Sequence, residues 1–376
     1  MDKKPAHLES VTVSYLRGLA ALGVVMLHVR IFLWAGWNDV HADKSVGIWD
    51  KMCSWLSIPT PFGGIGVTLF FLLSGFCIAL PYTKSAGRKL HFKEYFLRRF
   101  LRIYPPYFVA ILLTALVELI LAWEGLNHMT SANTYVSTLL MVQNYTTGSI
   151  SSNGSLWSLP IEMELYLVFP IVYYLLRTHT VKALLIVTAV VSFAAFTAYM
   201  LGAVWLGENF AKYWLLWCSG AVLADYYAAG RLRKPPLSVK AVGLLALIVA
   251  LGGQMHQWVP GLLDFIYGIF FVVLLWLGLT TEVNWSKRIN GVGAKFLSTL
   301  GLISYSLYLI HYPFFKLCGA LWVRYFGSKP INFLIPVCFA LLAIPLAYLF
   351  YTLVEVPSHR WAKGVTKRTN AKQLRP

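Results

Sequence analysis

The sequence predicts an all-α, polytopic transmembrane helical bundle, and three observations carry this prediction. Hydrophobic residues fill 58% of the 376 positions, and charged residues fill only 12%. The mean hydropathy is +0.64, which together with the low charge lies far from the balance of a soluble globular domain. The apolar residues also gather into stretches long enough to cross a bilayer as helices.

About ten apolar stretches approach the roughly 20 residues that a transmembrane helix needs. The first has no small-residue cleavage site, so we expect an uncleaved span rather than a signal peptide. In chain order the stretches cover residues 11–33, 62–80, 104–122, 156–176, 183–205, 210–228, 240–256, 261–281, 296–318 and 331–354. The interruptions are too short for a soluble domain, so we expect one integral-membrane domain over residues 1–360 and a basic cytoplasmic tail at 361–376.

The net charge of +17 is placed as in a membrane protein rather than a nucleic-acid-binding protein. With the N-terminus inside, most of the 32 lysine and arginine residues fall on the cytoplasmic side, including those at 84–102 and in the tail, and Lys3, Lys4, Lys287 and Arg288. This positive-inside bias places both termini in the cytoplasm. We therefore expect a lipid bilayer as partner and no nucleic acid. The five cysteines are scattered and match no zinc spacing, so we expect no metal.

The first stretch carries a charged and a titratable residue, Arg17 and His28, inside an otherwise apolar run. Such residues are costly to insert into a membrane and usually serve chemistry or a transport path. Eleven residues advance a helix by about three turns, so both side chains leave one face with a rise of roughly 16 Å between them. We expect Arg17 and His28 to mark the two ends of a passage.

Three titratable residues from different stretches, His28, Glu162 and His311, are expected at a similar depth below the outer interface. A histidine near a carboxylate suits general base catalysis, because the carboxylate fixes the tautomer and favours the imidazolium. Glu164 leaves another helix face, so Glu162 is the preferred carboxylate. The alternative is that a histidine here only hydrogen-bonds a neighbouring helix, and this alternative weighs more for His311 than for His28.

Two further features have a functional and a structural interpretation. Arg98, Arg99 and Arg102 are three and four residues apart, so on a helix they can present one phosphate-binding surface. They can equally be a topological anchor. Ser74 and Gly75 lie within an apolar run, where they indicate either a helix break that lines a passage or close helix packing.

Six segments carry a resemblance to a known family. They are Arg17 and His28 with ten residues between them, and residues 69–76, 98–105, 155–162, 301–311 and 353–357. In this order and over nearly the whole chain, they resemble the acyltransferase 3 family of membrane O-acyltransferases. The resemblance implies transfer of an acyl group from cytoplasmic acyl-CoA, usually acetyl-CoA, to a hydroxyl of a cell-surface or periplasmic carbohydrate or glycolipid.

The resemblance also assigns roles to residues. His28 would be the essential catalytic residue and Arg17 its support, in a protein of the bacterial inner membrane. Arg98, Arg99 and Arg102 would hold the CoA phosphates beside Arg17, Ser74 and Gly75. On the acceptor side we expect the substrate-binding residues His311, Tyr308, Tyr166 and Trp157, with Tyr166 or Tyr308 stabilising the oxyanion.

Three questions stay open at this point. Buried Arg, His and Glu also suit a proton-coupled transporter of a polar or glycosylated solute, although the halves of the chain lack the inverted symmetry that such carriers often show. A structural partner of glycan-synthesis enzymes would not need His28. Within the enzymatic hypothesis, direct transfer and an acyl-histidine intermediate are both compatible with the sequence.

Overall fold

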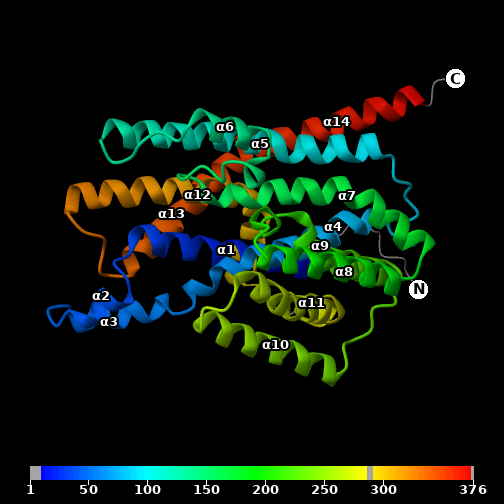
Figure 1. Cartoon of the computed structure of the whole chain (residues 1–376), viewed down its shortest axis with the longest axis horizontal. Coiled ribbons are helices and arrows are strands. Elements are labelled where there is room, and N and C mark those ends of the chain that lie inside the picture. The colour runs from blue at the N-terminus through cyan, green and yellow to red at the C-terminus, as the bar shows by residue number, and fades with distance from the viewer. Residues whose placement is uncertain (1–9, 286–290, 374–376) are drawn as a thin grey trace. The chain divides into compact units, whose positions relative to one another are not determined.

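The computed structural model describes residues 10–285 and 291–373. These residues form helices joined by turns, with no strand among them, which confirms the predicted all-α class (Figure 1). Four of the basic residues used for the predicted topology, Lys3, Lys4, Lys287 and Arg288, lie outside the described residues. The end of the predicted tail, residues 374–376, lies outside them as well.

Nine helical stretches within the described residues are long and apolar enough to cross a membrane. They are Val11–Leu33, Ile48–Tyr82, Phe92–Trp123, Gly154–Thr178, Val181–Met200, Leu237–Met255, Pro260–Glu282, Val292–Phe326 and Leu334–Gly364. Nine of the ten predicted spans therefore have a counterpart. The tenth, predicted at 210–228, forms helix α9 (Phe210–Ala228), but its charged and aromatic residues leave it short of the hydropathy of the other nine.

The chain divides into two compact units, and each is built from three separate segments. Unit 1 contains Met1–Ala20, Ile65–Tyr95 and Ile161–Leu302, and unit 2 contains Ala21–Gly64, Phe96–Pro160 and Ile303–Pro376. Helix α1 (Val11–Leu33) contributes to both units, so that Arg17 belongs to unit 1 and His28 to unit 2.

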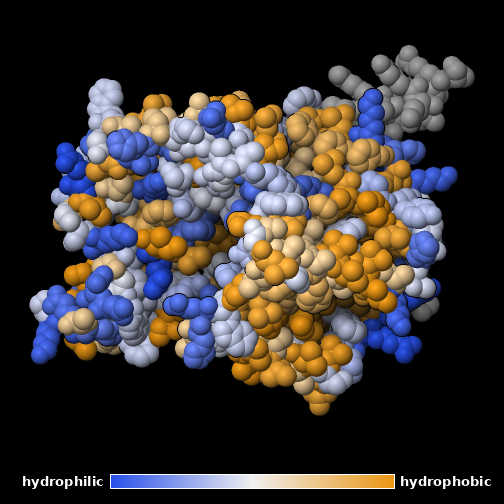
Figure 2. Space-filling model, in the orientation of Figure 1, coloured by the Kyte–Doolittle hydropathy of each residue, from blue (hydrophilic) through white to orange (hydrophobic). Residues whose placement is uncertain are grey.

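Unit 1 is organised around α9, which packs against α4 and α8, while α10 packs against α11 (Figure 1). Apolar side chains gather over α8, α10 and α11 on the face shown in Figure 2, as expected of helices in contact with lipid. The elements that lie wholly in this unit are α4 (Gly66–Ala79), η3 (Leu80–Tyr82), α8 (Val181–Met200), η6 (Val204–Leu206), α9, α10 (Leu237–Met255) and α11 (Pro260–Trp285). Four more helices lie in it only in part: the first part of α1, of α5 (Phe92–Trp123) and of α12 (Val292–Phe326), and most of α7 (Ser158–Thr178).

Two glycines allow α4 and α9 to approach each other closely. A Cβ atom on Gly75 would fall on the backbone carbonyl of Trp217, and one on Gly220 would fall on that of Leu72. Helix α4 runs without a break through Ser74 and Gly75. The helix break considered for this position is therefore not observed, and close helix packing explains Gly75.

We expect Gly75→Ala to lower the free energy of unfolding by about 1–3 kcal/mol, because the added methyl group meets backbone that cannot move aside. The matched control is Gly252→Ala in α10, where a Cβ atom meets nothing within 4 Å. That control should be neutral, or stabilising by up to about 1 kcal/mol from helix propensity. Heating the detergent-purified variants and recording the apparent melting temperature checks both; equal melting temperatures would contradict the prediction.

Unit 2 contains the remaining part of α1 and of the long helices α5 and α12. Its C-terminal part runs through α13 into a π-helical turn, Tyr351–Glu355, and on into α14, and such turns are frequent at functional sites. The other elements are α2 (Trp37–Ala42), α3 (Ile48–Ser54), η1 (Trp55–Ser57), η2 (Thr60–Ile65), α6 (Ala132–Leu139), η4 (Gln143–Tyr145), η5 (Gly154–Trp157), α13 (Leu334–Phe350) and α14 (Val356–Gln373).

Candidate active site

In unit 2, α1 and α12 bring two histidines into direct contact. His311 Nε2 lies 2.9 Å from His28 Nδ1, and the ring centroids are 5.0 Å apart. His311 is fully buried, whereas His28 is half-buried. The other ring nitrogen of His311, Nδ1, lies 2.9 Å from the backbone carbonyl oxygen of Leu307, one turn earlier on α12. The two predicted histidines therefore form one imidazole pair.

Local packing in unit 2 explains why the two imidazoles meet. A Cβ atom on Gly319 of α12 would fall on the carbonyl of Phe32 in α1, so this glycine allows the two helices to lie close together. The ring of Tyr312 stands edge-on to both His28 and Phe32, with centroids 4.9 Å apart in each case. Aromatic packing of this kind restrains the His28 ring on one side.

Tyr308 is tied to the segment that leads into α7. Its hydroxyl donates to the carbonyl of Ser155 at 2.7 Å and lies 2.7 Å from Ser158 Oγ. The single phenolic O–H of Tyr308 thus donates to the backbone carbonyl, and in the second contact Ser158 is the donor and the Tyr308 oxygen the acceptor. Tyr308 holds η5 against α12, and its hydroxyl would have to exchange this partner to stabilise an oxyanion.

The loop before α7 is fixed by buried amides. Asn153 Nδ2 donates to the carbonyl of Leu309 at 3.0 Å and to Thr114 Oγ1 at 3.1 Å. Asn144 Nδ2 donates to the carbonyl of Trp157 at 2.8 Å. The predicted substrate-binding residue Trp157 therefore lies on a backbone that hydrogen bonds from neighbouring amides hold in place.

In unit 1, Glu162 of α7 joins Tyr166 and Ser74. Tyr166, one turn later on α7, donates its hydroxyl proton to the Glu162 carboxylate. Ser74 Oγ of α4 donates to the same carboxylate oxygen at 3.4 Å, and Trp217 Nε1 of α9 donates to Ser74 Oγ at 3.4 Å. Three predicted site residues thus form one polar cluster. Because Glu162 and His28 belong to different units, their pairing stays a prediction.

Glu164 has a structural task in unit 1. Its carboxylate accepts a hydrogen bond of 2.9 Å from the backbone N–H of Phe210, the first residue of α9. A carboxylate at a helix N-terminus satisfies an otherwise unpaired amide and interacts favourably with the helix dipole. This contact agrees with the preference for Glu162 over Glu164 as the functional carboxylate.

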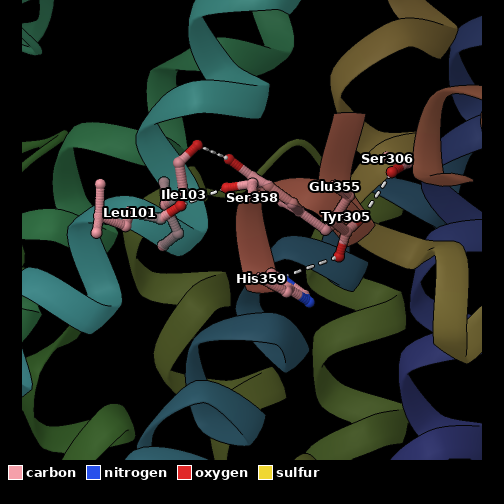
Figure 3. A network of polar contacts seen from close by, with 7 residues as sticks. All are labelled: Leu101, Ile103, Tyr305, Ser306, Glu355, Ser358 and His359. Atoms are coloured by element: carbon pink, nitrogen blue, oxygen red, sulfur yellow. Dashed lines mark hydrogen bonds and ion pairs between the residues drawn. The ribbon is translucent and has the colours of Figure 1, made fainter. Parts of the chain in front are cut away.

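The basic turn of α5 lies in unit 2, where Arg98, Arg99 and Arg102 are half-buried on a continuous helix. Two hydroxyl groups bind the backbone of the same turn, as Figure 3 shows: Ser358 of α14 donates to the carbonyl of Leu101, and Tyr305 of α12 donates to that of Ile103 at 2.8 Å. The three arginines are therefore carried by a turn that α12 and α14 hold in place.

Beside this turn lies a buried carboxylate that the sequence reasoning left without a role. Glu355, at the end of the π-helical turn, accepts a hydrogen bond from Ser306 Oγ and lies 3.6 Å from His359 Nε2 (Figure 3). The positive charges of Arg99, Arg102 and Lys363 act on the same imidazole. Since the carboxylate stands between Ser306 and His359, the histidine does not activate this serine as a base would in a nucleophilic triad.

His359 could have been found from its spacing, because it follows Glu355 by four residues and a pair at this spacing meets on a helix. Arg17 lies half-buried on α1 in unit 1, next to Gly18. A Cβ atom on Gly18 would fall on the carbonyl of Leu297, so α1 and α12 are also closely packed at this level.

Within the described residues, the fold and these contacts define a polytopic, all-helical membrane protein with an imidazole pair, of which His311 is fully buried, and a cationic helical turn. Comparison with known proteins then shows the family. The chain belongs to the acyltransferase 3 family, because the model of that family, described as an acyltransferase domain, matches residues 11–352. This match confirms the resemblance seen in the sequence, and the protein is an integral-membrane acyltransferase by family.

Individual relatives are bacterial. Acyltransferase MdmB of Streptomyces mycarofaciens is 28% identical over 341 residues, which cover 83% of this chain and 80% of the relative. O-acetyltransferase OatA of Staphylococcus aureus is 25% identical over 374 residues, covering 91% of this chain and 56% of the relative. Peptidoglycan O-acetyltransferase OatA of Listeria monocytogenes is 24% identical over 336 residues, covering 80% and 49%.

The extent of these matches differs. This chain spans about half the length of the OatA proteins and most of the length of MdmB. No solved structure matches the chain. The family and the relatives therefore establish the class of enzyme, an acyltransferase.

Proposed function

We propose that the protein transfers an acyl group, most often acetyl, from cytoplasmic acyl-CoA to a hydroxyl of a cell-surface or periplasmic carbohydrate. The observation that carries this proposal is the contact between His28 and His311 within the membrane-spanning helices of an acyltransferase-family chain. The OatA relatives, which are named O-acetyltransferases, support both the acetyl group and the oxygen acceptor.

In this proposal His28 is the general base. It takes the proton of the acceptor hydroxyl as that oxygen attacks the thioester carbonyl carbon, and a C–O bond forms. The C–S bond then breaks, and His28 returns the proton to the departing CoA sulfur. An acyl-histidine intermediate is the variant in which His28 attacks the thioester first.

The donor is proposed to enter at the basic turn of α5. Arg98, Arg99 and Arg102 would bind the CoA phosphates, since the guanidinium fork suits phosphate recognition. Arg17 would stand near this end, and the roughly 16 Å rise from Arg17 to His28 along α1 suits an extended pantetheine arm. Ser74 and Gly75 were predicted at this passage; Ser74 lies against Glu162, and Gly75 has its packing role against α9.

Glu162 is proposed to favour the charged form of the His28 imidazole during the reaction. Its hydrogen bonds to Tyr166 and Ser74 hold the carboxylate in one orientation. Tyr166 and Trp157 stay candidates for contact with the acceptor. The positive-inside bias further supports cytoplasmic termini, and the bacterial relatives support a place in the bacterial plasma (inner) membrane.

One assay separates this proposal from its alternatives. Purified protein in detergent is given acetyl-CoA with and without a carbohydrate acceptor, and release of the free CoA thiol is measured. The enzyme hypothesis predicts thiol release that depends on the acceptor. A proton-coupled transporter or a structural assembly partner predicts none, and that result would contradict the proposal. Mass spectrometry of surface glycans from cells with and without the protein then identifies the acetylated hydroxyl.

A further inference from the structure

We infer that His311 is a positioning residue: through its contact with His28 it holds the proton of that imidazole on Nδ1 and leaves Nε2 unprotonated as the reacting nitrogen. The inference rests on the proposed role of His28 as the base and adds a role for His311 that differs from the acceptor contact predicted for it. Its basis in unit 2 is the contact of His311 with the Leu307 carbonyl, its contact with His28, and its complete burial.

A backbone carbonyl determines the tautomer of His311. Its Nδ1 lies 2.9 Å from the carbonyl oxygen of Leu307. A carbonyl oxygen can only accept a hydrogen bond, so Nδ1 of His311 carries a proton and donates it. In a neutral imidazole the second nitrogen, Nε2, is then an acceptor.

Burial determines the charge of His311. A second proton on Nε2 would make an imidazolium in a fully buried position. Burying a charge is costly unless a charge of opposite sign compensates it. The polar contacts of the ring go to the backbone carbonyls of Leu307 and Tyr308 and to another imidazole, and none of these carries a negative charge. His311 is therefore the neutral tautomer with Nε2 as an acceptor.

The tautomer of His311 in turn determines that of His28. The 2.9 Å contact between His311 Nε2 and His28 Nδ1 needs one donor, and His311 Nε2 is the acceptor. His28 thus donates from Nδ1, and its lone pair lies on Nε2; the backbone of Val24, one turn earlier on α1, is a further hydrogen-bond partner of this ring. When Nε2 takes the proton of the acceptor hydroxyl, Nδ1–H remains bonded to His311, which is the orienting task that a carboxylate performs in a Ser-His-Asp triad.

The surroundings keep His311 from changing its orientation. Its ring is packed between Tyr308 and Phe315, whose centroids lie 5.9 Å and 6.0 Å from it. Tyr308 is itself anchored by its bonds to Ser155 and Ser158. The hydrogen bond from the Tyr308 hydroxyl to the backbone thus has a functional explanation: it holds the Tyr308 ring in place, and that ring restrains the His311 ring.

Two substitutions of His311 separate positioning from mere space filling. His311→Phe keeps a ring of similar size in an aromatic pocket but removes the acceptor, and His311→Gln places an amide oxygen near the position of Nε2. We expect His311→Phe to lower kcat by ~10²-fold with little change in the KM for acetyl-CoA, because general base catalysis is impaired while donor binding is not. His311→Gln should retain most of the kcat.

The tautomer itself can be observed. In histidine-labelled protein the ¹⁵N NMR signals of His28 are identified by their loss in His28→Gln, and they should report a protonated Nδ1 in the natural protein and in His311→Gln. His311→Phe should shift them toward protonated Nε2. An unchanged tautomer in His311→Phe, or equal loss of kcat in both variants, would overturn the inference. Full activity of His28→Gln would instead overturn the proposed function, so the two failures are distinguishable.

Discussion

Replacement of His28 by glutamine is expected to lower kcat for acyl transfer by ~10²–10⁴-fold, the range that a general base contributes. The side chain is half-buried and lies against His311 and Tyr312. Glutamine fills similar space and can form hydrogen bonds, but it cannot take up a proton at neutral pH. The measurement is CoA thiol release by purified protein at saturating acetyl-CoA and acceptor.

The matched control for this substitution is His128→Gln, at an exposed histidine in the loop that follows α5. It should leave kcat unchanged. Equal elution of both variants from size-exclusion chromatography establishes that His28→Gln is folded. A folded His28→Gln protein with the kcat of the natural protein would contradict both the base and the acyl-histidine mechanism.

Loss of the basic turn is expected to weaken donor binding strongly. Removing a charge-assisted hydrogen bond costs about 1.5–3 kcal/mol, which corresponds to ~10–10²-fold in affinity. Arg99→Gln and Arg102→Gln should therefore each raise the KM for acetyl-CoA by about that factor, with a smaller effect on kcat. Initial rates over a range of acetyl-CoA concentrations check this.

A donor without phosphates gives the sharper version of the same test. For S-acetyl-pantetheine, which lacks the groups that the arginines are proposed to bind, the KM should be high in the natural protein and unchanged in both variants. Arg324→Gln, at an exposed arginine in the last turn of α12, is the control and should alter neither KM. A parallel rise in KM for both donors would indicate a structural role for the turn instead.

Much of the fold could be predicted from the sequence because a membrane imposes a simple rule. A span needs about 20 apolar residues with internally satisfied backbone, and nine of the predicted stretches match helices in the described residues that are long and apolar enough to cross a membrane. Helix α9 shows where the rule weakens: it is buried by its neighbours in unit 1, so it can carry Lys212, paired with Asp264 at 2.9 Å. Hydropathy alone does not show that a charged residue in a span is buried beside a partner of opposite charge.

The candidate site was predictable in its residues but less so in their pairing. Depth along a helix indicated that His28 and His311 reach one level, yet depth says nothing of which spans are neighbours. The contact between the two imidazoles depends on α1 and α12 lying together, which Gly319 allows. The contact of Glu355 with Ser306 could not be predicted for the same reason, because the two residues are 49 positions apart in the sequence.

The most direct test of the account uses proteoliposomes in which a cleavable tag reports which side the termini face. Acetyl-CoA labelled in the acetyl group is supplied on the side of the termini, and a carbohydrate acceptor on the other. The account predicts labelled ester on the acceptor, lost when acetyl-CoA is moved to the acceptor side and lost in His28→Gln. Passage of the acceptor across the membrane without acetylation, or labelling that does not depend on His28, would contradict it.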